Sequence, residues 1–316
     1  MRKVRLGAQG PEVSSIGYGA WEAGGDFWGP NDSDEQVVSA IRAGLEAGIN
    51  WIDTAEVYGN GESERLVGKA VEGWTGIRIA TKVAPRPSGT GFRAAEVRRA
   101  CEESLRRLGR DTIDLYQLHW RDPRVQVEET WTAMAQLVED GLVGAIGVSN
   151  FDEDLIERCL AVRHVDSLQP QLSMLHLRHR ELAAWCGERG IGVITYGPLG
   201  YGLLTGGIRS REDLDPGDWR RNSPGHSYFD AMFAPGKLER SLEVVDRLRG
   251  VADRLGVTVA QLSLAWNVHQ QGVTAAIAGS RNPEHVRQNA AAGELELDGP
   301  TLQELEQILQ LGPDFA

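Results

Sequence analysis

Residues 113–149 read IDLYQLHWRDPRVQVEETWTAMAQLVEDGLVGAIGVS, and their pattern decides the fold class. The apolar runs at 113–119 and 145–149 are typical of buried strands. Between them, apolar residues recur at three- and four-residue spacing from Trp131 to Val138, which indicates an amphipathic helix. A strand, a crossover helix and a second, parallel strand form the basic unit of an α/β protein. The stretch therefore predicts one such unit.

The same alternation of strand and helix continues along the whole chain. Further short apolar runs are found at 15–20, 51–53, 77–83, 167–171, 192–196 and 274–278. Eight strands alternating with helices over about 250 residues predict a (β/α)8 TIM barrel, with residues 1–316 forming a single domain. A doubly wound sheet is the alternative. It is disfavoured because Gly17 and Gly19 are followed by Glu22, where the third glycine of a dinucleotide-binding G-x-G-x-x-G would stand.

Two segments depart from a minimal barrel. Residues 2–16 contain a turn at Gly10 and Pro11 between short alternating runs, which predicts a β-hairpin that caps the bottom of the barrel. Residues 200–236, before the last strand, are rich in Gly, Pro, Asp and Arg and have little periodicity. Because irregular loops of more than about 15 residues usually have a function, we interpret this segment as a lid loop.

The composition excludes several classes of protein. Lys and Arg number 33 against 45 Asp and Glu, a net charge of −12, so nucleic acid is not an expected partner. No apolar stretch approaches the ~18 residues of a membrane span, and the N-terminus lacks the apolar core of an export signal. Three widely spaced cysteines support neither a disulfide framework nor a metal site, and His176 and His179 have no third ligand nearby. We therefore expect a cytoplasmic protein without metal.

Four polar residues stand at or just after the ends of three consecutive strands. They are Asp53, Tyr58, Lys82 and His119. The carboxyl ends of barrel strands meet on one face, so these side chains can converge. A nearby ammonium group such as that of Lys82 stabilises a tyrosine phenolate and lowers the tyrosine pKa, and Asp53 supplies the counter-charge that a buried lysine needs. Together they form a set of groups suited to proton transfer.

Seven segments in order along the chain carry a family resemblance. They are IDTAEVYGNGESERLVG (52–68), IATKV (79–83), LYQLHW (115–120), GVSNF (147–151), QPQLSML (169–175), ITYGPLGYGLLTG (194–206) and IAGSRNPEHVRQN (277–289). The chain resembles the aldo-keto reductases, a family of NAD(P)H-dependent (β/α)8 oxidoreductases, over essentially its whole length.

The resemblance implies roles for the four polar residues. Tyr58 would be the general acid that protonates a carbonyl oxygen as hydride reaches the carbon, and His119 would orient the carbonyl. Lys82 and Asp53 would tune the proton of Tyr58. The substrate would be a small aldehyde, ketone or sugar-like carbonyl, or the corresponding alcohol.

The resemblance also implies a nicotinamide cofactor site. Ser149, Asn150 and Gln171 would bind the carboxamide, and Tyr196 would stack on the nicotinamide ring. The other cofactor residues implied are Trp21, Gly197, Pro198, Leu199, Gly202, Gly279, Ser280, Arg281, Gln288 and Asn289. A guanidinium at Arg281 suits the 2′-phosphate of NADP(H), which is the expected cofactor, with NAD(H) as the alternative. His285, Gln288 and Gly207 depart from the residues usual in this pattern.

Loops around the barrel mouth would set the substrate. Trp21, Trp28 and Trp120 are the candidate substrate residues, with Phe27 and Tyr201 near them. Two alternatives remain open. One is an NAD-dependent sugar or polyol dehydrogenase on the same scaffold. The other is a cofactor-binding regulatory subunit resembling potassium-channel β subunits, which the intact set of four polar residues disfavours.

Overall fold

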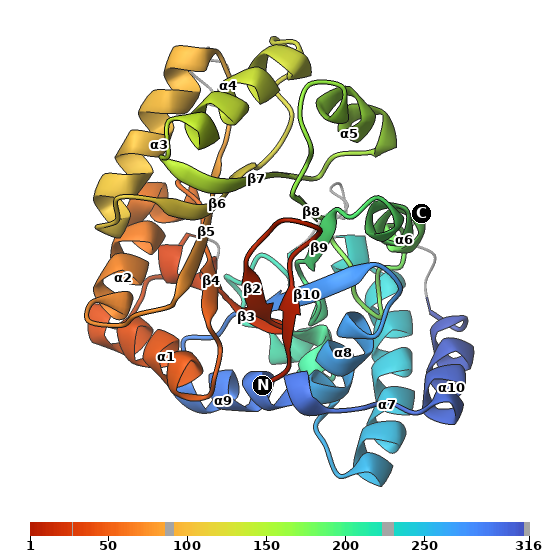
Figure 1. The fold of residues 1–316 in the computed structure, drawn as a ribbon. Helices are drawn as coiled ribbons and strands as arrows, with labels where there is room; N and C mark the ends of the chain where they lie inside the picture. Colours follow the sequence, from red (N-terminus) through yellow and green to blue (C-terminus); the bar gives the residue numbers. More distant parts are fainter. Residues whose placement is uncertain (27, 86–91, 223–230, 313–316) are drawn as a thin grey trace.

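The computed structural model describes residues 1–26, 28–85, 92–222 and 231–312 (Figure 1). Within these ranges eight parallel strands close into a barrel in the order β10-β3-β4-β5-β6-β7-β8-β9, which confirms the predicted (β/α)8 fold. The strands are β3 (Ile16–Gly19), β4 (Trp51–Asp53), β5 (Arg78–Val83), β6 (Ile113–Leu118), β7 (Val143–Ser149), β8 (Ser167–Gln169), β9 (Gly192–Thr195) and β10 (Val273–Ala278). The barrel closes where β10 pairs with β3, with Ala276 opposite Ile16.

Helices surround the barrel (Figure 1). They are α1 (Asp34–Glu46), α2 (Glu62–Val71), α3 (Ala94–Leu108), α4 (Val127–Glu139), α5 (Glu153–Leu160), α6 (Arg180–Glu188), α7 (Lys237–Leu255), α8 (Val259–Val268), α9 (Pro283–Ala291) and α10 (Gly299–Leu309). Side-chain caps fix several of their starts: Ser33 accepts a hydrogen bond from the Gln36 amide and Asp152 from the Leu155 amide. Among the described residues, no helix is long and apolar enough to cross a membrane.

Alternate residues of each barrel strand point inward and outward. In β5, Ile79 packs against the surrounding helices, whereas Ala80 belongs to the cluster that fills the barrel. That interior cluster contains Leu6, Val13, Trp51, Ala80, Leu115, Ala145, Ile194, Ala275 and Ile277. A Cβ atom on Gly17 would lie 2.3 Å from the Trp51 ring, so a glycine is needed for this tryptophan to fit. Side chains therefore fill the middle of the barrel.

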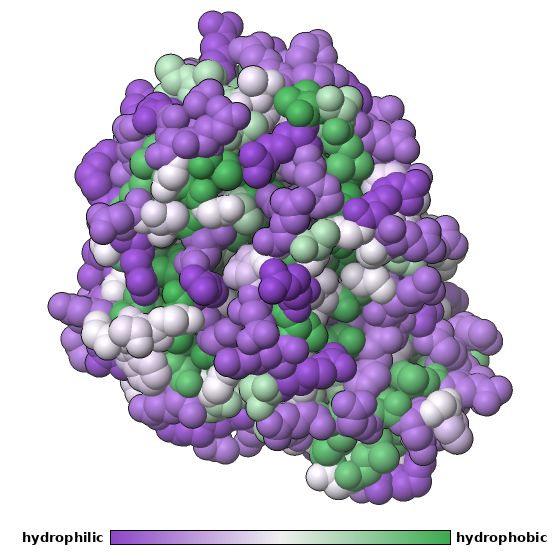
Figure 2. Space-filling model, in the orientation of Figure 1, coloured by the Kyte–Doolittle hydropathy of each residue, from purple (hydrophilic) through white to green (hydrophobic). Residues whose placement is uncertain are grey.

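The N-terminal hairpin caps the barrel as the sequence predicts. Strands β1 (Lys3–Arg5) and β2 (Glu12–Ser14) pair antiparallel, and the hairpin lies across the barrel end in Figure 1. Leu6 packs into the barrel interior, and the Ala8 amide donates to the Gly190 carbonyl, 2.8 Å away, just before β9 begins. In the same orientation, Figure 2 shows a mostly hydrophilic surface with small hydrophobic areas between. The amino ends of the strands are thus closed, and the chemistry belongs at the other end.

The segment at 200–236 is more ordered than its sequence suggests. It contains the short 3-10 helices η3 (Gly200–Thr205), η4 (Arg211–Asp213) and η5 (Ala231–Phe233), and its residues 223–230 lie outside the described ranges. Leu203 and Leu204 are fully buried in a cluster shared with α7 and α8. Apolar side chains therefore anchor the segment beside the barrel mouth, and its function as a lid stays a prediction.

Candidate active site

A cavity of about 840 Å³ opens at the carboxyl ends of the barrel strands. Its floor continues the inward-facing side of the strands: Asp53 ends β4, His119 follows β6 and Ser149 ends β7, and all three line the cavity. Every second residue of a strand faces the barrel interior. The inward positions in the middle of the strands hold the packed core, and those at the carboxyl ends form the polar floor of the cavity. The barrel geometry thus gathers residues that lie far apart in the sequence.

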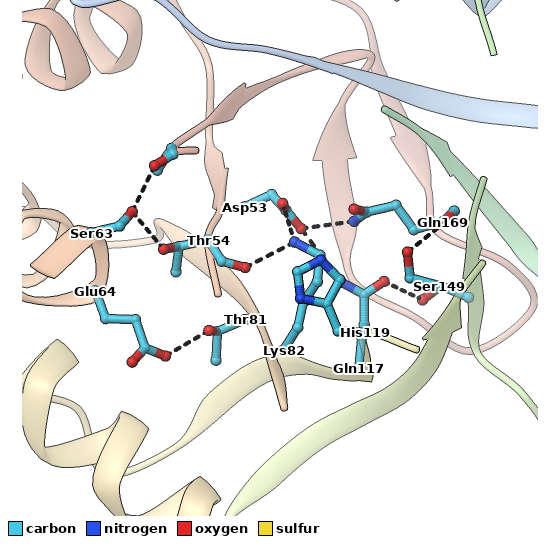
Figure 3. Close-up of polar contacts among 12 residues, drawn as sticks. Asp53, Thr54, Ser63, Glu64, Thr81, Lys82, Gln117, His119, Ser149 and Gln169 are labelled. Atoms are coloured by element: carbon cyan, nitrogen blue, oxygen red, sulfur yellow. Dashed lines mark hydrogen bonds and ion pairs between the residues drawn. The ribbon is translucent and has the colours of Figure 1, made fainter. Parts of the chain in front are cut away.

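Asp53 and Lys82 form a buried ion pair in the floor (Figure 3). Lys82 Nζ lies 2.5 Å from Asp53 Oδ1 and donates to the Thr54 carbonyl at 2.9 Å. On its other oxygen, Asp53 accepts a hydrogen bond from Gln169 Nε2 at 2.8 Å. Burial lowers the pKa of Lys82 from its ordinary value, and the Asp53 carboxylate opposes that shift. The pair is therefore held in one orientation by hydrogen bonds on both members.

Tyr58 lies over this pair. Lys82 Nζ is 5.3 Å from the centre of the Tyr58 ring, and the His119 ring stands edge-on to it with centroids 5.6 Å apart. Tyr58 begins the 3-10 turn η2 (Tyr58–Gly61), in which Gly59 has φ +60°, a conformation that favours glycine. The structure therefore brings Asp53, Tyr58, Lys82 and His119 together, as their sequence positions suggest.

A second polar network fixes the loop that carries Tyr58. Ser63, at the start of α2, donates to the Ala20 carbonyl at 2.7 Å and lies 2.8 Å from Thr54 Oγ1 (Figure 3). The next residue, buried Glu64, accepts from Thr81 at 2.6 Å and pairs with Arg107 at 2.6 Å. Helix α2 is thereby tied to the ends of β3 and β4, to β5 and to α3, which limits the positions that the Tyr58 loop can take.

The surroundings of His119 favour its neutral form. Burial, and then the charge of Lys82, lower the pKa of His119 well below its ordinary value. Its ring stacks on Trp120 with centroids 3.8 Å apart. A neutral imidazole held in this way can donate or accept one hydrogen bond without adding charge to the floor.

Two of the candidate carboxamide residues are hydrogen-bonded to each other: Asn150 Nδ2 donates to Ser149 Oγ at 3.1 Å. Ser149 Oγ donates to the Gln169 carbonyl at 2.8 Å, and Asn150 Nδ2 donates to the His119 carbonyl at 3.0 Å. Tyr196 Oη donates to Asn150 Oδ1 at 2.7 Å. Asn150 has φ +59°, an uncommon conformation for a residue other than glycine. Ser149, Asn150 and Tyr196 all line the cavity.

Gln169, rather than Gln171, reaches the cavity wall. Both glutamines have the same inward parity, but Gln169 is level with Ser149 in the register of β7 and β8. Gln171 lies one step higher beside Tyr196, where its amide is buried without a hydrogen-bond partner among the described residues. Both glutamines belong to the QPQLSML motif, so the motif does not show which of them lines the cavity. The register of β7 and β8 does.

The far end of the cavity is built by the segments after β9 and β10. Gly197, Pro198, Leu199 and Gly202 line one side, and Gly279, Ser280, Gln288 and Asn289 line the other. Each of these candidate cofactor residues is therefore at the wall.

Arg281 is not at this wall. Its guanidinium donates to the carbonyls of Trp28, Gly29 and Pro30 and to the Asn31 side chain. The Arg281 guanidinium, which the sequence predicts to bind a phosphate, thus forms hydrogen bonds with the 28–31 loop that follows β3.

Two acidic residues that the motifs did not indicate also line the cavity. Burial raises the pKa of Glu22, while the charges of Arg281 and Arg220 oppose this shift. Asp26 accepts a hydrogen bond from the Gly59 amide at 2.7 Å. Both lie just after β3, in the stretch that also contains Trp21 and Trp28.

Aromatic side chains form the outer walls. Trp21 contacts Trp28 and Tyr201 edge-on, with ring centroids 5.3 and 6.0 Å apart. Trp120 is 41% exposed at the mouth. Trp21, Trp28, Trp120 and Tyr201 therefore occupy the positions expected of substrate residues, whereas Phe27 lies outside the described residues.

His176 and His179 lie outside this site. Their rings are 5.6 Å apart, and no group of three potential metal ligands exists among the described residues. His176 is 1% exposed, and neither ring nitrogen has a partner in the described part of the chain. Burial lowers the pKa of His176 to about 4.

This burial makes stability depend on pH. Between pH 6.5 and 4, the unfolded chain protonates His176 and the folded chain does not, so protons favour unfolding. We expect the contribution of His176 to the free energy of unfolding to be level above pH 7 and to fall by about 1.4 kcal/mol per pH unit below pH 6.5. Urea unfolding at pH 7.5, 5.5 and 4.5 measures this. His176→Phe should remove that part of the slope; an unchanged slope would contradict the assignment.

Comparison with known proteins agrees with the fold. Residues 15–310 match the sequence model of the Aldo/keto reductase family, and the chain belongs to this family of oxidoreductases. It is 33% identical to the aldo-keto reductase YhdN of Bacillus subtilis (strain 168), over 100% of this chain and 97% of that protein.

Two solved structures have the same fold. The glycerol dehydrogenase AKR11B4 from Gluconobacter oxydans is 30% identical, with a TM-score of 0.87 over 97% of this chain and 94% of that one. The aldo-keto reductase from Klebsiella pneumoniae in complex with NADPH is 31% identical, with a TM-score of 0.76 over 99% of this chain and 97% of that one.

Proposed function

We propose that this protein is an NADP(H)-dependent oxidoreductase that interconverts a small carbonyl compound (an aldehyde, a ketone or a sugar-like carbonyl) and its alcohol. The observation that carries the proposal is the buried Asp53–Lys82 pair beneath Tyr58, with His119 beside it, at the floor of an aromatic-walled cavity. Family membership supports the same class of reaction.

In this proposal Tyr58 gives its phenolic proton to the carbonyl oxygen during reduction and takes it back during oxidation. The nearby ammonium of Lys82, 5.3 Å from the ring centre, stabilises the phenolate that remains. Neutral His119 donates a hydrogen bond to the same oxygen and so fixes the direction in which the carbonyl points. Asp53 holds Lys82 under the tyrosine ring rather than taking part in proton transfer itself.

The residues of the cavity fit a nicotinamide dinucleotide. Ser149, Asn150 and Gln169 supply hydrogen-bonding groups for a carboxamide at the floor, and Tyr196 offers a ring face beside them. Gly279 and Ser280 would contact the adenosine end near the start of α9, where helix amides favour phosphate. When bound, the cofactor supplies the hydride.

NADP(H) is the proposed cofactor because a related structure from Klebsiella pneumoniae contains NADPH and because Ser280, Arg281 and Arg220 supply polar and basic groups near this end. Binding would require the Arg281 guanidinium to share its donors between the 28–31 loop and a phosphate. The five N–H groups of a guanidinium permit such sharing.

Tight-binding titrations with NADPH and with NADH, followed by quenching of tryptophan fluorescence, test the proposal. We expect NADPH to bind at least about tenfold more tightly, since charge-assisted hydrogen bonds to the extra phosphate are stronger than neutral ones. Arg281→Gln should reduce that preference and leave NADH affinity less affected. If neither cofactor binds, the proposed function is wrong.

A second candidate is an NAD-dependent dehydrogenase of sugars or polyols. The engagement of Arg281 with the 28–31 loop and the carboxylate of Glu22 at the wall favour it, because both disfavour a 2′-phosphate. The similar Gluconobacter protein is a glycerol dehydrogenase. Equal or tighter binding of NADH would select this candidate. Cofactor binding without any turnover would instead favour a regulatory subunit.

A further inference from the structure

Asp26 occupies a fixed place at the mouth of the cavity. It follows the 3-10 turn η1 (Glu22–Gly24) and lines the cavity wall while remaining exposed to solvent. Its Oδ2 accepts a hydrogen bond from the Gly59 amide at 2.7 Å. Because Gly59 directly follows Tyr58, the carboxylate is held against the same turn that carries the proposed general acid.

The negative charge of Asp26 is not balanced by a cation. Two other charged side chains at the wall form ion pairs, Asp53 with Lys82 and Arg220 with Asp218, and the charge of Arg281 acts on Glu22. Among the residues that the structure describes, Asp26 forms no salt bridge, and its contact is the neutral Gly59 amide. The mouth therefore has a net negative charge close to the reacting centre.

Apolar side chains form much of the wall at the mouth of the cavity. Trp21 and Trp28 contact each other edge-on, Val57 is 39% exposed, and Trp120 stacks on His119. The Arg220 guanidinium donates three hydrogen bonds to Asp218 and one to the Tyr201 carbonyl. A carboxylate on a substrate would thus find apolar surface, a committed arginine and the like charge of Asp26.

We propose that Asp26 determines substrate specificity by excluding anionic carbonyl compounds, so that the site takes uncharged aldehydes and ketones. This inference rests on the proposed function. A carboxylate on the substrate would lie within the range of partly screened electrostatic repulsion from Asp26, and Arg220, at the same cavity wall, is already paired with Asp218. An uncharged substrate loses nothing from this arrangement and gains from contact with the tryptophans.

Two substrates of nearly the same size and shape, 4-carbamoylbenzaldehyde and 4-carboxybenzaldehyde, differ in charge. Their kcat/KM values should favour the uncharged amide in the wild-type protein. Asp26→Asn keeps an oxygen that can accept from the Gly59 amide but removes the charge. We expect this variant to reduce the preference about tenfold, and 0.5 M salt to reduce it in the wild type as well. Asp111→Asn, an exposed position before β6, is the control for net charge and should leave the preference unchanged.

Binding of benzoate and benzamide, followed by tryptophan fluorescence, gives a readout that needs no turnover. The Asp26→Asn variant should gain affinity for benzoate relative to benzamide. An unchanged ratio in either assay, or an equal shift in Asp111→Asn, would overturn the role of Asp26. If neither aldehyde is reduced by any variant but the benzoate shift occurs, the role of Asp26 stands and the proposed function fails.

Discussion

Phenylalanine in place of Tyr58 should lower kcat for carbonyl reduction by about 10²–10⁴-fold, the loss typical of a missing general acid. The reason is that the Tyr58 hydroxyl gives up the proton in the proposed mechanism, and the Lys82 ammonium stabilises the phenolate that remains. Ring packing against His119 and Trp21 is retained in the variant. Steady-state kinetics with saturating NADPH, together with the cofactor Kd, measure the effect, and the Kd should stay within about twofold.

Tyr116→Phe is the matched control for this variant. Tyr116 lies in β6 on the outward face, buried among helices, and its hydroxyl has no partner among the described residues. Its replacement removes the same atom from the same protein and should leave kcat unchanged. If Tyr58→Phe reduces carbonyls at the parent rate, Tyr58 is not the acid.

Asp53→Asn should destabilise the fold by about 3–5 kcal/mol, because it leaves the ammonium of Lys82 buried without a counter-charge. Lys82 is fully buried, and the Asp53 carboxylate is its ionic partner at 2.5 Å. The variant lowers the folded-state pKa of Lys82 further, so the unfolded chain binds more protons than the folded chain. The loss in free energy of unfolding relative to the wild-type protein should therefore become smaller as the pH rises towards the ordinary pKa of lysine. Urea unfolding at pH 7 and pH 9.5 measures both effects.

The double variant Asp53→Asn/Lys82→Met distinguishes loss of the charge from loss of packing. Removal of both charges leaves no uncompensated ion, so this protein should be more stable than the single variant even though more of the native site is gone. A double variant less stable than Asp53→Asn would show that packing, not charge, dominates. Turnover should be low in both variants, since Asp53 no longer holds Lys82 under the Tyr58 ring in the single variant and the ammonium is absent in the double variant.

Most of the fold follows from patterns that can be seen in the sequence. Buried parallel strands are short apolar runs, and each of the eight predicted runs overlaps a barrel strand. The floor of the site follows from the same periodicity: Ala80 is an interior residue, so Lys82, two residues later, also points inward. Inward-facing positions such as these can be predicted from the alternation of side chains within a single strand.

The features that sequence analysis missed depend on relations between distant segments. Gln169 and Gln171 have the same parity, and strand register determines which one reaches the cavity. Arg281 looks free for a phosphate until the fold places the Asn31 side chain, 250 residues away in the chain, beside its guanidinium. The segment after Gly200 lacks periodicity because Tyr201 and Gly202 have positive φ, so its buried leucines do not follow a helical spacing.

The closure of the barrel between β10 and β3 has a consequence for biosynthesis. Tyr18 Oη, at the end of β3, donates to the Ser280 carbonyl after β10, and these residues are 262 positions apart. During translation the first barrel strand must therefore wait until nearly the whole chain has left the ribosome before both its edges are paired. Contacts of such long sequence separation slow folding and leave strand edges exposed meanwhile. The nascent protein should thus depend on chaperones until β10 emerges, and a chain truncated before Val273 should be recovered mainly as aggregate.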